Sequence, residues 1–305
     1  MLTDQPGKIA EGLYLLGSQQ NLMYLVRGRE NMIIGGGMSW IAPYLEEQLA
    51  SLNVEPDGIH YLVIQHAHFD HIGAIPYMQR KFPSMKVMAT AAARATLARE
   101  KVMQYMDIAN KMAVGHIGRK ESYEKLDLSI GIINVDEVIG DSAVVDLGNG
   151  MAINFIETPG HSPCALSVYI PSLKAIFPTD SAPCPIGSIE NLARPSPQYD
   201  YNLYKISLQK LLRYDIEICA YDHYAAVLGP DARQVLLNGL ALCKEFEEHV
   251  IGLYREVGNM EQVARQVAFE TTGFTRFDFV DEEIMLPVSR AVARNVLKAA
   301  GLAGL

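Results

Sequence analysis

The stretch HYLVIQHAHFDHIGAIPYM, residues 60–78, decides the fold. It begins within a nearly continuous apolar run, Ile59–Gln65, which is typical of a buried strand. An H-x-H-x-D-H motif follows where that strand ends, made of His66, His68, Asp70 and His71. Helical spacing then continues to about Phe82. A buried strand that leads through clustered ligand-type side chains into a helix predicts an α/β fold with a site at the strand end.

The motif has the chemistry of a metal centre. Residues two apart on an extended segment project to the same side, so His66 and His68 can share one ion. Asp70 and His71 turn into the following helix and can reach a second ion. Neutral imidazoles and carboxylates suit zinc, iron, manganese and similar cations. We therefore predict two divalent metal ions, with zinc favoured and iron or manganese as alternatives.

Three single residues elsewhere in the chain also follow predicted strands. His161 comes after the strand MAINFIE, Asp180 ends the strand KAIFP, and His223 follows the strand IEICA. The carboxyl ends of strands are where α/β proteins place their ligands. An aspartate can bridge two cations, because each of its carboxylate oxygens can coordinate one. We predict that these three residues complete the metal site.

The pattern along the chain predicts α/β layers followed by helices. The first 60 residues alternate short apolar runs with turns, as in a meander of strands, before helical spacing appears at 39–52. Residues 91–125 are helix-rich and carry a methionine-containing apolar stripe, which we interpret as a core or interface face. We predict a metal-binding domain, 1–230, with a helical insertion at about 91–125, and a helical C-terminal extension, 231–305.

Composition limits the partners that the chain can have. It has 305 residues with 26 basic and 35 acidic side chains, and the net charge of −9 argues against nucleic acid. No run approaches the roughly 18–20 apolar residues of a membrane span, and the first residues lack a signal-peptide pattern. Four cysteines without a C-x-x-C pair fit a reducing compartment. We expect a cytoplasmic protein that contacts no membrane.

The complete ligand set resembles that of the metallo-β-lactamase superfamily, over residues of about 10–228. The resemblance implies a four-layer αββα sandwich that holds one or two metals. It implies one ion held by His66, His68 and His161, another held by Asp70, His71 and His223, and Asp180 as the bridge. Residues 60–78 also look like the thioesterase-like quinolone-signal response branch of this superfamily, which likewise ends in helices.

Departures from the family pattern bear on the local geometry. Many members have an aspartate in a strand-end motif of the form L-I-D-T-G, whereas this chain has glycines at 35–37, so a supporting carboxylate is absent. Thr179 precedes the bridging position, where the family often has glycine. Asp222 and Tyr224 flank the last histidine in place of glycines. The bridging residue is an aspartate and not a cysteine, which disfavours β-lactam hydrolysis.

The motif and the resemblance together predict a dinuclear metal-dependent hydrolase. A metal-bridging hydroxide would attack an ester-like carbonyl that one cation polarises. Asp70 would act as the catalytic residue that orients the water or moves its proton. A thioester is the favoured substrate, because a thiol with a pKa near about 8.5 leaves with little protonation.

Other functions stay open from the sequence. One alternative is a lactonase or another esterase of the same fold, and another is persulfide dioxygenation with a single iron. A third is a metal-bearing regulatory or interaction protein with vestigial hydrolysis, in which 91–125 and the helical extension form a partner or homodimer surface.

The expected substrate is a small acyl compound. The candidates for a general acid are Tyr199, Tyr201 and Tyr224, and the candidates for lining an acyl channel are Phe274, Phe277 and Phe279. Each of these residues has ordinary packing as its alternative role. The helical extension has two interpretations in the same way, as a substrate-selecting lid or as a cover for an exposed sheet or pocket edge.

Overall fold

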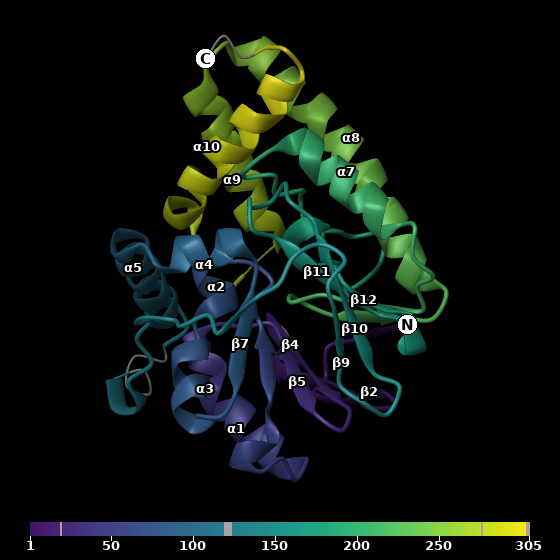
Figure 1. The fold of residues 1–305 in the computed structure, drawn as a ribbon. Helices are drawn as coiled ribbons and strands as arrows, with labels where there is room; N and C mark the ends of the chain where they lie inside the picture. The colour runs from purple at the N-terminus through teal and green to yellow at the C-terminus, as the bar shows by residue number, and fades with distance from the viewer. Residues whose placement is uncertain (19, 119–123, 276, 303–305) are drawn as a thin grey trace.

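The protein has four layers, in which two sheets pack face to face between two layers of helices (Figure 1). The computed structural model describes residues 1–18, 20–118, 124–275 and 277–302. The predicted αββα sandwich with C-terminal helices is confirmed. Part of the predicted insertion, 119–123, lies outside the described residues, as do 276 and 303–305 of the predicted extension. Among the described helices, none has both the length and the apolar content needed to cross a bilayer.

The first sheet has the strand order β2-β3-β4-β5-β6-β7-β8. Its strands are β2 Gly7–Ala10, β3 Leu13–Ser18, β4 Asn21–Arg27, β5 Asn31–Ile34, β6 Tyr61–Val63, β7 Lys86–Ala89 and β8 Glu137–Val138. The pairs from β2 to β5 are antiparallel, as the alternation of apolar runs and turns predicts, and the pairs from β5 to β8 are parallel. Parallel neighbours need crossover connections, which here are helical.

The crossover helices cover the outer face of the first sheet. They are α1 Ala42–Ser51, α2 Phe69–Ile72, α3 Ile75–Lys81, α4 Ala91–Leu97 and α5 Glu100–His116. Buried apolar residues such as Leu45, Ile75 and Leu97 pack these helices onto the sheet. The expected helix from Ile72 to Phe82 is therefore two helices, because Gly73 and Ala74 separate α2 from α3.

The second sheet has the strand order β1-β14-β13-β12-β11-β10-β9. Its strands are β1 Leu2–Thr3, β9 Val144–Asp146, β10 Ala152–Glu157, β11 Leu166–Ile170, β12 Ala175–Phe177, β13 Ile218–Ala220 and β14 Ala226–Leu228. Among the described strands of this sheet, only β12 and β13 pair in parallel, and the helix α7 Tyr201–Leu211 lies between them in the chain. The other pairs in this sheet are antiparallel.

The inner faces of the two sheets form one continuous apolar core. Alternate residues of each strand point inward, such as Leu13 and Leu15 from the first sheet and Ile153 and Phe155 from the second. The rings of Tyr24 and Phe177 meet edge to face across the two sheets, with centroids 5.0 Å apart. This core sets which strand ends of one sheet lie beside which strand ends of the other.

Three C-terminal helices pack on the second sheet together with α7. They are α8 Asp231–Val257, α9 Met260–Thr275 and α10 Glu282–Ala299, and their inward faces are rich in buried valine, alanine and leucine. Asp281 caps α10 by accepting a hydrogen bond from the Ile284 backbone N–H. The segment between α9 and α10 reaches the first sheet's helices, since Phe279 packs with Met38 and with Ala113 of α5. The last helices therefore contact both halves of the sandwich.

The core between the sheets should dominate stability. Phe155 is 1% exposed at this interface, and Phe155→Ala is expected to lower the free energy of unfolding by about 3–5 kcal/mol in a urea titration. Val144 on the neighbouring strand is 60% exposed, so Val144→Ala is the control and should change it by less than about 0.5 kcal/mol. Equal effects of the two changes would contradict the packing described.

Candidate metal centre

Four of the seven predicted ligands enter the site from the first sheet. β6 ends at Val63, and His66 and His68 lie on the extended segment that follows, while Asp70 and His71 lie within the short helix α2. Gln65 fastens this segment to the second sheet, because its Nε2 donates to the Phe177 carbonyl at 3.0 Å. The loop that carries the motif is thus held between the sheets.

The other three predicted ligands come from strand ends of the second sheet. His161 follows β10, Asp180 lies in a 3-10 turn after β12, and His223 follows β13. The turn that leads into His161 requires a glycine. Gly160 has φ +144°, and a Cβ there would lie 2.3 Å from the Tyr204 backbone, which brings α7 against the site. The structure brings all seven predicted residues to one edge of the sandwich.

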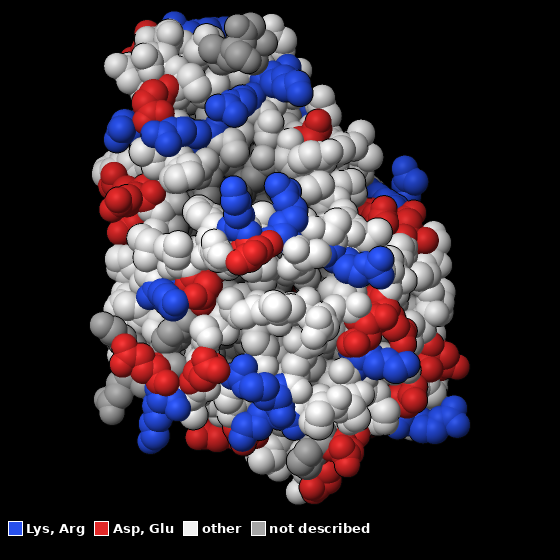
Figure 2. Space-filling view, turned by 60° about the vertical axis from the view of Figure 1, so that its left-hand side comes forward, with Lys and Arg blue, Asp and Glu red and all other residues white. Residues whose placement is uncertain are grey.

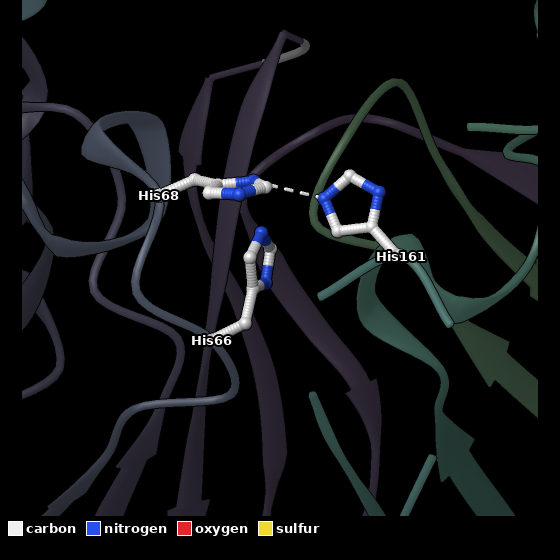
Figure 3. A group of neighbouring side chains, drawn as sticks. All are labelled: His66, His68 and His161. Carbon is white, nitrogen blue, oxygen red and sulfur yellow. Dashed lines mark hydrogen bonds between the residues drawn. The ribbon is translucent and has the colours of Figure 1, made fainter. Parts of the chain in front are cut away.

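The first cluster consists of His66, His68 and His161. One ring nitrogen from each lies within 4.8 Å of the others. Figure 3 shows His66 and His68 reaching in from the segment after β6, with His161 facing them from the segment after β10. The shortest approach, between His68 Nδ1 and His161 Nε2, is 2.9 Å. These are the residues that the resemblance assigns to one ion.

The second cluster consists of Asp70, His71 and His223. Their ligand atoms also lie within 4.8 Å of one another, and His71 Nε2 is 3.2 Å from His223 Nε2. The Asp70 Oδ2 atom is 3.5 Å from His71 Nε2 and 3.7 Å from His223 Nε2. These are the residues assigned to the other ion.

Asp180 lies between the two clusters. Its Oδ2 is 3.3 Å from His161 Nε2, 3.4 Å from His71 Nε2 and 3.8 Å from His66 Nε2. Its Oδ1 is 3.7 Å from His223 Nε2. A carboxylate in contact with imidazoles of both clusters occupies the place that a bridging ligand needs. Metal binding by the seven residues stays a prediction that this geometry fits.

The hydrogen bonds behind the histidines fix which nitrogen faces inward. Nδ1–H of His161 donates to the Ser196 carbonyl at 2.7 Å, and Nδ1–H of His223 donates to the Gln20 carbonyl at 2.6 Å. Because carbonyl oxygens can only accept, Nε2 of each neutral ring carries the lone pair. His66 Nε2 is buried without a hydrogen-bond partner. Inward lone pairs and an unpartnered buried nitrogen fit a divalent cation, which would satisfy them together.

Burial sets the protonation of the first cluster. Burial and the neighbouring imidazoles hold the pKa of His66 well below its usual value, and burial with His161 lowers the pKa of His68 to about 3. Burial also lowers the pKa of His161. All three rings are therefore neutral near pH 7, which is the form that binds metal.

In the middle of the site, nearby carboxylates outweigh the lowering of histidine pKa values by burial. Burial disfavours a charge on His71, but Asp70 and Asp180 outweigh it and raise the pKa of His71 well above its usual value. Burial works against the charge on Asp180 as well, and His71 and His161 nevertheless hold the pKa of this carboxyl well below its usual value. Asp180 is thus an anion that can bind cations.

A cavity of about 280 Å³ opens beside Asp70 and Asp180, whose side chains are 17% and 24% exposed. Its walls are mostly apolar. One wall comes from α5, through Tyr105, Met106 and Ala109. The opposite wall comes from α9, α10 and the segment between them, and includes Phe277, Phe279, Ile284, Met285 and Val288. The C-terminal helices therefore enclose the site.

Two of the six aromatic candidates line this cavity. Phe277 and Phe279 do so and pack against His223, with ring centroids 5.1 and 6.5 Å away. Their contact with a substrate stays a prediction. The remaining four are Tyr199, Tyr201, Tyr224 and Phe274, and the structure places none of these described side chains in the cavity wall.

These four side chains lie elsewhere for separate reasons. The Tyr201 hydroxyl donates to the Cys243 carbonyl at 2.6 Å, inside the helix layer. The Tyr224 hydroxyl donates to the Thr275 carbonyl and so attaches α9 to the site. Tyr199 is 50% exposed and Phe274 is 40% exposed.

Sequence reasoning missed several residues of the site. Tyr204 of α7 lines the cavity, and so do Tyr105 and Met285. The available signal was the apolar stripe of 91–125, which includes Met106 and Ala109 and which we interpreted as a core or interface face. Nothing local marks Tyr204, because its position depends on how α7 packs.

Comparisons with known proteins agree with this architecture. The family model described as the metallo-beta-lactamase superfamily matches residues 16–223. The metallo-beta-lactamase fold-containing protein ST1585 of Sulfurisphaera tokodaii is 26% identical over 194 residues, which is 64% of this chain and 66% of that protein. Exodeoxyribonuclease WalJ of Streptococcus pneumoniae is 24% identical over 117 residues, which is 38% of this chain and 42% of that enzyme. The matches therefore span 66% and 42% of these curated relatives.

Solved structures share the fold at lower identity. The metallo-beta-lactamase family protein TTHA1429 from Thermus thermophilus superimposes with a TM-score of 0.68 at 15% identity, covering 96% of this chain and 95% of that one. The crystal structure of ST1585 gives a TM-score of 0.58 at 20% identity, covering 75% and 85%. Likeness at this level concerns the fold and not the activity.

Metal binding can be tested without a substrate. Zn²⁺ added to metal-free protein is expected to raise its melting temperature, since ions that bind only the folded chain stabilise it. Elemental analysis should find about two ions per chain, and His68→Ala should leave about one. His116→Ala is the control, because His116 lies on α5 with a side chain that is 39% exposed, and it should keep both ions. Two ions in His68→Ala would show that the first cluster is not a ligand set.

Proposed function

The chain belongs to the metallo-β-lactamase superfamily, and on that premise we propose that it is a dinuclear metal-dependent hydrolase that cleaves thioesters with a compact apolar acyl group. The observation that carries the proposal is the apolar cavity beside Asp70 and Asp180. An acyl chain in this cavity would bring its carbonyl carbon next to the carboxylates of the site.

The two clusters have complementary tasks in such a reaction. Two divalent cations would supply Lewis acidity toward the carbonyl oxygen and a nucleophile from water near neutral pH. Asp180 lies between the clusters and would hold both ions. Asp70, whose side chain is partly exposed and lines the cavity, would orient water and take its proton. The buried imidazoles keep the donor atoms rigid.

The leaving group favours a thioester over an oxygen ester. An alkoxide needs a proton as it leaves, but Tyr201 and Tyr224 donate their hydroxyls to backbone carbonyls away from the reacting carbonyl. Tyr204 lines the cavity, and burial raises its pKa well above the usual value, which makes it a poor proton donor. A thiol with a pKa near about 8.5 leaves as a thiolate without this help.

The charges around the cavity disfavour anionic substrates. Among the described residues that line it, Arg194 is the one lysine or arginine, and its guanidinium pairs with Glu270 at 2.7 Å. A phosphodiester or a substrate carboxylate bound beyond the ions would need an unpaired cation. On the face in Figure 2, a band of basic side chains crosses the upper part, and basic and acidic side chains intermix below it.

The size of the cavity limits the acyl group. Ligand pockets are typically about 300–1,000 Å³, and this cavity of about 280 Å³ is slightly smaller than that range. A hexanoyl or benzoyl group fits such a volume, whereas a large thiol carrier would extend out of it. We therefore place the acyl half inside and the thiol half at the mouth.

The proposed reaction predicts a ranking of substrates. Metal-loaded protein should hydrolyse hexanoyl and benzoyl thioesters faster than the matching oxygen esters, measured by release of the free thiol or alcohol. His68→Ala should lower kcat/KM by about 100-fold or more, since removing a group that holds the catalytic ion removes transition-state stabilisation. Turnover of lactones without thioesters would instead indicate a lactonase. Two bound ions without turnover of any activated ester would favour the regulatory interpretation.

The cavity wall predicts acyl-chain selectivity. Ala109→Phe is expected to fill part of the cavity and to lower kcat/KM for hexanoyl thioesters by about 10-fold or more while acetyl thioesters keep their rate. The matched control is Ile108→Phe, because Ile108 is the preceding residue of α5 and is 56% exposed. Equal effects on both acyl lengths would show that the cavity does not bind the acyl chain.

A further inference from the structure

A chain of hydrogen bonds joins the two clusters from behind. His66 Nδ1 lies 3.1 Å from the Thr179 hydroxyl, which donates to Asp222 Oδ2 at 2.7 Å. The same oxygen lies 2.9 Å from His71 Nδ1. All four residues are 3% exposed or less. Water therefore does not compete for these bonds.

The direction of each bond follows from the carboxylate. Asp222 Oδ2 can only accept, so it takes both the Thr179 hydroxyl proton and the His71 Nδ1 proton. The Thr179 oxygen then has lone pairs left to accept Nδ1–H of His66. In the neutral form of each ring, which is the form that binds metal, Nε2 is thereby left with its lone pair facing the site. One carboxylate fixes the tautomer of two rings that belong to different clusters.

The backbone conformation at Thr179 indicates that its side chain has a role beyond forming the turn. Thr179 has φ +49°, a left-handed conformation that is rare for a β-branched residue and easy for glycine. A residue needed only for the turn would be better served by glycine, which is what the family pattern often has there. Threonine at a strained position points to its hydroxyl as the useful group.

We propose that Thr179 and Asp222 are positioning residues that make ion binding at both clusters depend on one buried carboxylate, an inference that rests on the metal centre of the proposed function. Asp222 supplies the supporting carboxylate that the glycines at 35–37 do not. It acts on His71 directly and on His66 through the Thr179 hydroxyl. Loss of the hydroxyl therefore affects one cluster, and loss of the carboxylate affects both.

The test uses two variants that each retain one cluster, and it measures their Zn²⁺ affinity by competition with a chromophoric chelator. His223→Ala leaves the first cluster, and His68→Ala leaves the second. Added to His223→Ala, Thr179→Gly should weaken Zn²⁺ binding by about 10- to 100-fold. Added to His68→Ala, it should leave the Zn²⁺ affinity unchanged. Asp222→Ala should weaken binding in both. Thr179→Ser keeps the hydroxyl and should bind like the parent in both.

A second readout separates positioning from folding. The melting temperature of the metal-free Thr179→Gly protein should fall only slightly, because relief of the strained φ offsets part of the cost of the two lost buried hydrogen bonds. Unchanged Zn²⁺ affinity in Thr179→Gly would overturn the proposal, as would equal weakening of both clusters by that change. If Asp222→Ala does not fold, the Zn²⁺ affinities of Thr179→Gly and Thr179→Ser still test the proposal. Wild-type protein that binds two ions but does not cleave thioesters would contradict the proposed function and leave the positioning proposal standing.

Discussion

The two sheets have to pack in one register, because neither of them carries a complete ligand set. The first sheet supplies the four residues of the H-x-H-x-D-H motif, and the second supplies His161, Asp180 and His223 from three separate strand ends. The apolar faces between the sheets bring these ends together, and Gln65 pins the motif-bearing segment to the second sheet. The hydrophobic core is therefore what assembles the clusters.

Local patterns account for the parts of the fold that the sequence predicts. The longer strands and α7 to α10 have clear apolar periodicity, and the αββα arrangement follows from the ligand motif and its resemblance. The strands that no pattern indicated, β1, β2, β8 and β14, have two to four residues each. Length alone does not separate them from the predicted strands, because β6, β12 and β13 also have three residues each. Each of the four missed strands pairs with a neighbouring strand that offers it hydrogen bonds.

Local sequence patterns also predict only part of the candidate site. The seven ligand-type residues could be chosen in advance, because each follows a recognisable strand. Apart from Phe277 and Phe279, the cavity walls could not be chosen in advance, since they depend on how α5 and the C-terminal helices pack across the site. Thr179 and Tyr224 stood out only as departures from glycine. In the structure both residues have a left-handed backbone, with φ +49° and +64°, which glycine adopts most easily.

Because α9, α10 and the segment between them form one wall of the cavity, the cavity is built from two separate parts of the chain. All seven ligand-type residues lie within 16–223, the portion that the superfamily shares, whereas one wall of the cavity lies beyond it. The ligand-type residues and one part of the proposed acyl-binding wall are thus encoded in different stretches of the gene. Under the proposed function, changes in the last 75 or so residues would alter acyl selectivity while the ligand-type residues stay the same.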